Sequence, residues 1–134
     1  MKKILFITAL TTMIFLKVYA LENVFIVFKI NNEIITNIDI KKETNFLVAL
    51  NKSLETLSEK QLLDLSKKSI VKEIIKKKEV IKYFELNQEA PFLNTFIENL
   101  YTKLNLANLS ELEFFLNTHD LTVEDVKKKI EIEH

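Results

Sequence analysis

The chain has 134 residues, of which 48% are hydrophobic and 28% charged, and its 19 basic residues balance its 19 acidic ones. This length suits one folded domain with a hydrophobic core, and the apolar content excludes a disordered chain. Every basic side chain is a lysine, so nucleic-acid binding is not expected. The absence of cysteine and glycine excludes disulfides, thiolate nucleophiles and glycine-rich phosphate-binding loops.

Residues 1–20 have the pattern of a secretory signal peptide. Two lysines precede an apolar run over residues 4–16, and Val18 and Ala20 are the small residues expected before a cleavage site. A helix of this length spans about 20 Å, less than the roughly 30 Å hydrocarbon core of a bilayer. A transmembrane anchor is the weaker alternative. We therefore expect export to the periplasm, a mature chain from Leu21 onward and no stable membrane insertion.

The segment from Val24 to Thr36 carries the strand signal of this chain. β-Branched and aromatic residues make up residues 24–28, and a second short run follows at residues 34–36. Between them lies Asn31-Asn32, and asparagine tolerates the positive φ of a tight turn better than most residues. The pattern predicts a β-hairpin, which must pack on helices because an isolated hairpin is marginal in water.

A long lysine-rich helix is predicted from Ser58 to Leu86. Ser58 and Gln61 form the pattern of a capping box at its start. Helical spacing places four aliphatic residues along one line, with Val71 and Phe84 beside it. These four residues are Leu63, Ile70, Ile74 and Ile81.

Four shorter helices are predicted around the long one. The first runs from an Asn37 cap to about Leu50, with its buried side formed by Ile38, Phe46, Leu47 and Leu50. The second begins near Pro91, and its apolar face is Phe92, Phe96, Ile97, Leu100, Tyr101 and Leu104. The third opens at Ser110 and carries Leu112, Phe115 and Leu116. The last begins at Thr122 and Asp125, with Val126 and Ile130 facing inward and Leu121 as a staple residue.

Asparagines follow several of these helical runs, in the place where glycine usually ends a helix. They are Asn51, Asn87, Asn105 and Asn117. The sequence thus predicts a mainly α-helical domain over residues 21–134, in which an N-terminal β-hairpin precedes about five helices packed around the long one.

Three stretches resemble the N-terminal domain of SurA-type periplasmic chaperones and peptidyl-prolyl isomerases. They are Lys29–Asp39, with its hairpin turn and the threonine before a helix; Ile70–Asn87, in the long helix; and Phe115–Val126, in the paired short helices. The third stretch continues to Ile130 and Glu133, and together the likeness covers about residues 22–133.

The resemblance implies a holdase that binds unfolded outer-membrane β-barrel proteins through an apolar groove, without ATP, metal or other cofactor. Family members usually continue into parvulin-type isomerase domains and a C-terminal segment that completes this domain. This sequence has neither, so we expect no enzymatic activity, and we expect exposed apolar surface where that segment would lie. A truncated fragment and a stand-alone relative are both open. The alternative function is an envelope scaffold or assembly subunit that uses the same apolar surface for a folded partner or for dimerisation.

Catalytic or metal-binding patterns are sparse. His119 lies beside Asp120, but no serine or cysteine nucleophile sits in a matching context, so an exposed loop histidine is the better interpretation. His134 and Glu131 make too few ligands for a metal cage. The run of residues 76–78 is lysine only, and we expect a solvated helix face supported by spaced pairs such as Glu73 with Lys77.

Phenylalanine is the main candidate for binding chemistry, with ten in the chain and no tryptophan. Most are expected in the core, but Phe114 and Phe115 are adjacent on a short helix, so at least one should point outward. An exposed aromatic patch suits the binding of extended apolar chains or self-association. The candidate client-binding surface is Phe92, Phe96, Tyr101, Phe114 and Phe115.

Overall fold

The computed structural model describes residues 23–86 and 91–133, so the predicted signal peptide lies outside the described residues. The elements in chain order are β1 (Ile26–Ile30), β2 (Glu33–Thr36), α2 (Asn37–Leu50), the 3-10 helix η2 (Lys52–Thr56), α3 (Glu59–Val80), α4 (Phe92–Lys103), α5 (Leu109–Asn117) and α6 (Val123–Glu133). The predicted fold class, a hairpin followed by five α-helices, is confirmed for this part of the chain.

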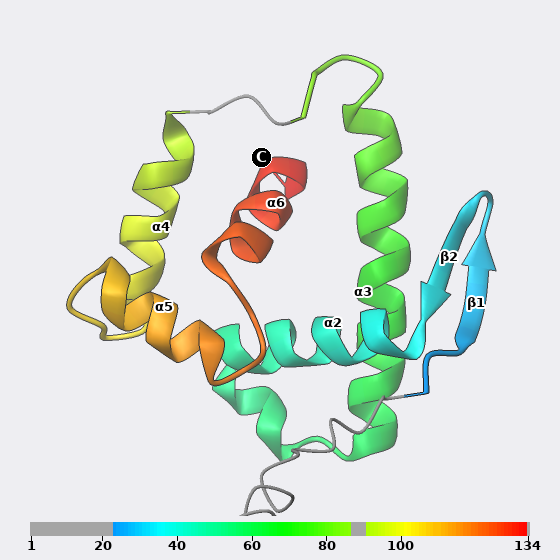
Figure 1. The fold of residues 1–134 in the computed structure, drawn as a ribbon, viewed down its shortest axis with the longest axis horizontal. Coiled ribbons are helices and arrows are strands. Elements are labelled where there is room, and N and C mark those ends of the chain that lie inside the picture. Colours follow the sequence, from blue (N-terminus) through cyan, green and yellow to red (C-terminus); the bar gives the residue numbers. More distant parts are fainter. Residues whose placement is uncertain (1–22, 87–90, 134) are drawn as a thin grey trace, which may run out of the picture.

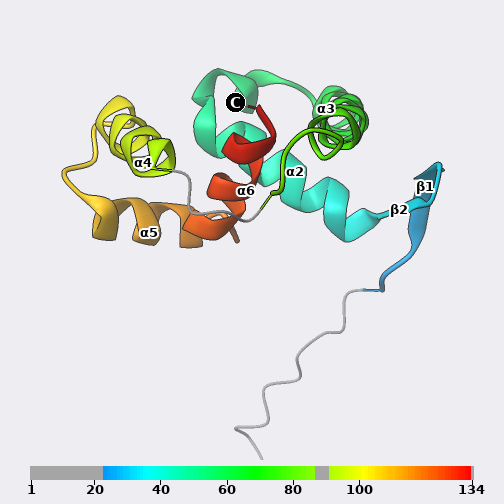
Figure 2. The same ribbon diagram turned by 90° about the horizontal axis from the view of Figure 1, so that it is seen from above.

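The helices form a frame around α6. In Figure 1, α2 crosses the base, α3 and α4 rise on opposite sides, and α5 lies at the foot of α4. Both views place α6 between α3 and α4 (Figures 1 and 2), and α6 contacts α3, α4 and α5. The C-terminal helix is therefore the element that connects the two sides of the frame.

The hairpin has the predicted turn and packs on the helices as expected. β1 and β2 pair antiparallel, with Ile30 opposite Glu33, and Asn31 adopts a φ of 53° in the turn. Ile35 on β2 is buried with Ile40 of α2 and Ile70 of α3. This small second core supplies the tertiary support that a two-stranded sheet needs.

Two helices begin at a different residue from the one predicted. Thr36, not Asn37, caps α2 through a reciprocal capping box with Asp39. The Asn37 side chain instead accepts a hydrogen bond from the Phe25 amide at 2.9 Å, which ties the start of β1 to the helix. Likewise Asn108, rather than Ser110, caps α5 by accepting from the Glu111 amide. In both cases a residue close by in sequence competes for the same amides.

The two other predicted capping boxes are confirmed. Ser58 and Gln61 bond each other's backbone amides at the start of α3. Thr122 and Asp125 do the same at the start of α6, at 3.0 and 3.2 Å. Local hydrogen bonding thus sets the start of the longest helix and of the central one.

Helix α3 ends at Val80, six residues before the predicted end at Leu86. The amides of Lys82 and Tyr83 bond carbonyls three residues earlier, so the helix closes in a tight turn. Ile81, Tyr83 and Phe84 are exposed, and so is Leu63 near the other end, although Ile81 and Leu63 were predicted on the buried line. A helix is stabilised mainly by packing, and these ends have little of it.

The crossing of α2 and α3 contains a small, buried polar contact. Ser66 is fully buried there, and its hydroxyl lies 2.7 Å from that of Thr44 and 2.8 Å from the Leu62 carbonyl oxygen. The residues of α2 that are fully enclosed are Ile40, Glu43 and Ala49, whereas the side predicted from Ile38, Phe46, Leu47 and Leu50 is half-buried. The buried stripe of α2 is thus rotated from the predicted one.

Of the asparagines predicted to end helices, only some adopt the conformation that glycine usually takes there. Asn105 adopts a φ of 58° after α4, the left-handed conformation expected at a helix stop. Asn51 ends α2 with a φ of −143°, and after α5 the positive φ falls on Asp120 rather than Asn117. Asn87 lies outside the described residues.

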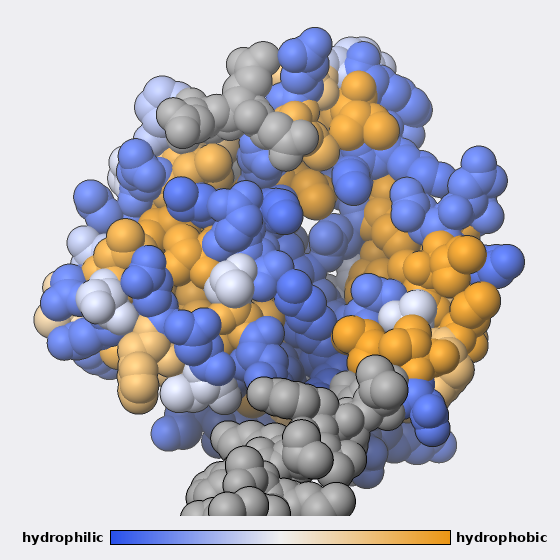
Figure 3. Space-filling view, viewed as in Figure 1, coloured by the Kyte–Doolittle hydropathy of each residue, from blue (hydrophilic) through white to orange (hydrophobic). Residues whose placement is uncertain are grey.

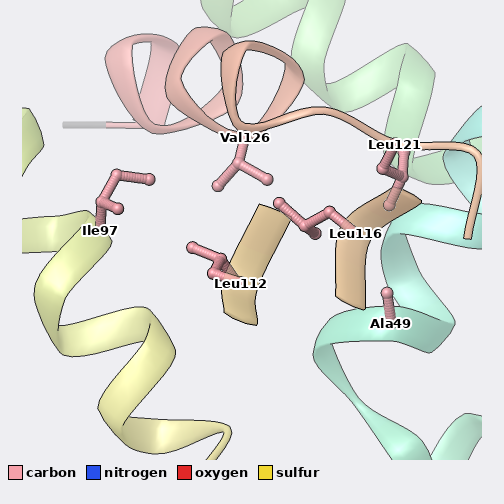
Figure 4. Packing of buried hydrophobic residues seen from close by; sticks show 6 residues of the cluster. All are labelled: Ala49, Ile97, Leu112, Leu116, Leu121 and Val126. Carbon is pink, nitrogen blue, oxygen red and sulfur yellow. The ribbon is translucent and has the colours of Figure 1, made fainter. Parts of the chain in front are cut away.

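The main core is where α5 and α6 meet α2 and α4 (Figure 4). Leu112 and Leu116 on α5 have no exposed surface, and Leu121 and Val126 beside them are almost as enclosed. These positions follow the predicted pattern for the two short helices. Figure 4 shows the side chains converging on the space between α4, α5 and α6, together with Ala49 and Ile97.

Replacing one core leucine should destabilise the fold far more than replacing its exposed neighbour. We expect Leu112→Ala to lower the free energy of unfolding by about 2–5 kcal/mol, because transfer energy is lost and a cavity remains. Phe114→Ala on the same helix should change it by less than about 0.5 kcal/mol. Urea unfolding followed by circular dichroism measures both, and equal losses would contradict this assignment of the core.

Candidate functional site: an apolar cleft walled by a buried lysine

An apolar cleft of about 550 Å³ opens between α2, α3, α4 and α6, and is called the central cleft below. Its apolar lining comes mainly from half-buried side chains: Phe46, Leu47, Leu50, Phe96, Leu100 and Ile130. Lys72, Lys76, Lys103 and Glu133 add charge to the lining. Four helices thus contribute to one mostly apolar concave surface, which is the usual form of a binding site.

A second hollow of about 390 Å³ lies between the hairpin, α3 and α6. Figure 3 shows the surface hollowed between α6 and α3, with apolar side chains toward α3 and the hairpin and mostly hydrophilic ones on the side of α6. This hollow and the central cleft share Glu43, Phe46, Glu73 and Lys129 as lining residues. These four residues therefore form the wall that separates the two spaces.

Lys129 is the centre of that wall. Its ammonium nitrogen lies 2.6 Å from Glu43 Oε2 on α2 and also pairs with Glu73 Oε2 on α3. The same nitrogen lies 4.8 Å from the centroid of the Phe46 ring, a cation–π contact. A single side chain of α6 thus joins α6 to both helices that it crosses. We call Lys129, Glu43 and Glu73 the lysine cluster.

The lysine cluster is largely removed from solvent. The Glu43 side chain is only 4% exposed, and its second oxygen, Oε1, is buried with no hydrogen-bond partner in the described part of the chain. Burial alone would lower the pKa of Lys129, but hydrogen bonds and attraction from Glu43 and Glu73 outweigh it and raise that pKa above its ordinary value. Lys129 is therefore held as a cation between the buried Glu43 carboxylate and the half-buried Glu73 carboxylate.

Two further polar contacts fix α6. Lys42 Nζ on α2 lies 2.6 Å from Asp125 Oδ1, and Lys76 Nζ on α3 donates to the Glu133 carbonyl oxygen at 2.6 Å. Burial raises the pKa of Asp125, but hydrogen bonds from Lys42 and Thr122 outweigh it, so the pKa is lowered overall. Both ends of α6 are thus tied to the frame by hydrogen bonds to lysine.

The five aromatic residues predicted to form one client-binding surface lie in different places. Phe96 lines the central cleft, and its ring meets that of Phe92 edge to face at 6.0 Å. Tyr101 and Phe115 pack against the main core. Phe114 is 75% exposed on α5, so the expectation that one of the two adjacent phenylalanines points outward is met.

His119, considered above for catalysis, packs on the last turn of α5. Its Nδ1 lies 3.0 Å from the Phe115 carbonyl oxygen, and its ring stacks at a tilt on the Phe115 ring. It is half-buried rather than exposed as predicted, because it packs on the end of α5. Within residues 23–86 and 91–133 there is no group of three or more potential metal ligands, and none of the helices there has the length and apolar character needed to cross a bilayer.

Sequence reasoning missed the lysine cluster, although one signal for it exists. Glu43 follows Ile40 by three residues and precedes Leu47 by four, so it occupies a position on an apolar helical stripe. A carboxylate there predicts a buried partner. The partner's identity depends on tertiary contacts, and the predicted pairing of Glu73 with Lys77 is wrong, because Glu73 pairs with Lys129.

Comparisons with known proteins identify no relative of this chain. No protein-family model matches this chain, and neither a curated protein nor a solved structure is significantly similar to it.

Breaking the lysine cluster from one side should be costly. We expect Lys129→Met to lower the free energy of unfolding by about 3–5 kcal/mol, because it leaves the Glu43 carboxylate buried without a counter-charge. The double variant Lys129→Met with Glu43→Leu should recover much of that loss, since no uncompensated charge remains in that pair. Urea unfolding of the wild type, both single variants and the double variant measures the coupling. Additive losses would show that the two residues do not interact.

The lysine cluster also predicts a dependence of stability on alkaline pH. The pKa of Lys129 is raised above 10.5 in the folded state, so its contribution is complete below the unfolded pKa and is lost as pH rises through the folded value. The stability of the wild type relative to the double variant should therefore be constant from pH 7 to about 10. It should fall above pH 10.5, because the contribution of the Lys129 cation is lost there. A difference that stays constant across this upper range would contradict the assignment.

Proposed function

We propose that this chain is a periplasmic holdase-type chaperone module that binds unfolded outer-membrane β-barrel proteins in the central cleft, without ATP. The observation that carries the proposal is the cleft itself, with its apolar lining from α2, α4 and α6 beside a charged wall. The expected export signal and the resemblance to SurA-type N-terminal domains supply the cellular context.

The chemistry of the cleft suits clients that share composition rather than sequence. Apolar contact is not directional, so side chains such as Leu47, Leu50 and Ile130 can accept different hydrophobic residues of an extended chain. The exposed charged residues of the lining, Lys72, Lys103 and Glu133, limit how much apolar surface is continuous. Weak and exchangeable binding of many segments is the result that a holdase requires.

An envelope scaffold or assembly subunit is the second candidate function. The exposure of Phe114, which lies away from the central cleft, favours a further contact with a folded partner. This role would need no unfolded client, so a client-binding assay separates the two candidates.

Aggregation suppression tests the proposed function. A β-barrel protein is diluted out of urea with or without the purified chain, and light scattering is followed over time, with an unfolded soluble protein as the comparison client. We expect suppression for the barrel client. No suppression by a folded, monodisperse chain would contradict the holdase proposal and favour the scaffold.

A matched pair of variants on α4 locates the binding surface. Phe96→Ser removes a ring that lines the central cleft, whereas Phe92→Ser removes an exposed ring that does not line it. We expect Phe96→Ser to weaken client binding about tenfold, the value of one buried phenylalanine side chain. Phe92→Ser should change it far less. Equal effects, in variants whose circular dichroism matches the wild type, would place the clients outside the cleft.

A further inference from the structure

The charges of this chain are separated between α3 and the stretch that contains α5. Helix α3 carries seven lysines and four acidic residues. Between Lys103 and Lys127, a stretch that includes α5, the sequence has five acidic residues and no lysine. The total charge balances, so this separation gives the molecule a basic end and an acidic end.

The basic end has an apolar centre. Val71 and Ile75 on α3 form a shallow apolar hollow lined on its sides by Lys67, Lys68, Lys72 and Lys76. Ile75 is 56% exposed. At 100° per residue these two residues lie opposite Glu73, which pairs with Lys129 of α6, so the apolar centre of the hollow is directed away from α6. Lys72 and Lys76 lie between the two spaces and line the central cleft as well. We call these six residues the basic face.

The lysines of the basic face are poorly neutralised by their own helix. Glu73 pairs with Lys129, and Glu79 pairs with Lys82 at 2.7 Å, so two of the four acidic residues of α3 are engaged elsewhere. Lys67, Lys68 and Lys72 have no ion pair within the described residues. A surface with an apolar centre and unneutralised cations fits a partner with an apolar projection between carboxylates.

Helix α5 presents such a projection. Phe114 is the most exposed phenylalanine of the described chain, and Glu113 and Glu111 lie one and three residues before it on an element that has no basic residue. One carboxylate oxygen of Glu111 accepts a hydrogen bond from the Ala107 amide at 2.8 Å, which holds this side chain near the start of α5. We call Glu111, Glu113 and Phe114 the acidic face. A large exposed aromatic side chain beside two carboxylates is the complement of the basic face in both charge and shape.

The two faces cannot meet within one molecule. Figures 1 and 2 agree in placing α3 and α5 on opposite sides of the frame, with α6 between them. We propose that two copies of this chain associate head to tail, with Phe114 of one copy against Val71 and Ile75 of the next and its glutamates toward the lysines. Such a contact is heterologous and leaves one free face at each end, so longer oligomers form as the concentration rises.

The test is sedimentation velocity on the chain, purified in the form that accumulates in the expressing cell. We expect the weight-average sedimentation coefficient to rise with concentration up to about 1 mM, the weak end of protein–protein affinity, and to rise less in high salt. A wild type that stays monomeric over this range would overturn the proposal.

Two variants identify the faces. Ile75→Ser disables the basic face and Phe114→Ser the acidic face, and both positions are exposed, so the fold should be retained. Each variant alone should stay monomeric, whereas an equimolar mixture should form a one-to-one heterodimer and nothing larger. Association of either variant alone to the wild-type extent, or a mixture that stays monomeric, would overturn the head-to-tail arrangement. The first result would mark a symmetric contact through the face that the associating variant keeps.

A charge exchange gives an independent check that keeps both apolar partners. In the equimolar mixture, Glu113→Lys in the chain that keeps Phe114 should weaken association. Lys72→Glu in the chain that keeps Ile75 should then restore part of it. Restoration that fails in both low and high salt would contradict the proposed pairing of α5 with α3. Client binding is measured separately, so failure of this inference leaves the holdase proposal unaffected.

Discussion

The position of α6 depends on one half-buried ammonium group. Lys129 reaches Glu43 on α2 and Glu73 on α3, so three helices that are distant in sequence meet at a single cation. Removing these groups from water is expensive, and a well-packed apolar trio would often be at least as stable. An apolar contact, however, has no preferred partner atom. We infer that the charges are useful because they fix which residues of the three helices face one another.

That constraint determines the shape of the proposed binding surface. With α6 held at its middle by Lys129 and near its ends by Lys42 and Lys76, it stands between α3 and α4 rather than collapsing onto either. The space left beside it is the central cleft, whose lining is mostly apolar, with charge from the lysine cluster and from Lys72, Lys76, Lys103 and Glu133. A rigid, polar wall next to a non-directional apolar surface can hold varied extended segments without folding around any one of them.

Local chemistry made much of this fold predictable. The Asn31 turn and the capping boxes at Ser58 and Thr122 depend on residues within a few positions of each other, and the structure has all three. The end of α3 and the partner of Glu43 depend on which helix lies alongside, and no local pattern contains that information. The candidate site was harder still. Aromatic composition pointed to five residues, but Phe96 is the one of them that lines the cleft, and Lys129 resembled any other surface lysine.

The most direct test of this account is to observe where an unfolded client lies. An extended segment of a β-barrel protein carrying a nitroxide label is titrated into the chain with labelled leucine and isoleucine methyl groups, and paramagnetic broadening is mapped by NMR. The account predicts the strongest broadening for Leu47, Leu50 and Ile130 in the central cleft, with little at Leu109 on α5. Broadening centred on the hairpin or on α5, with the cleft methyl groups unaffected, would contradict it.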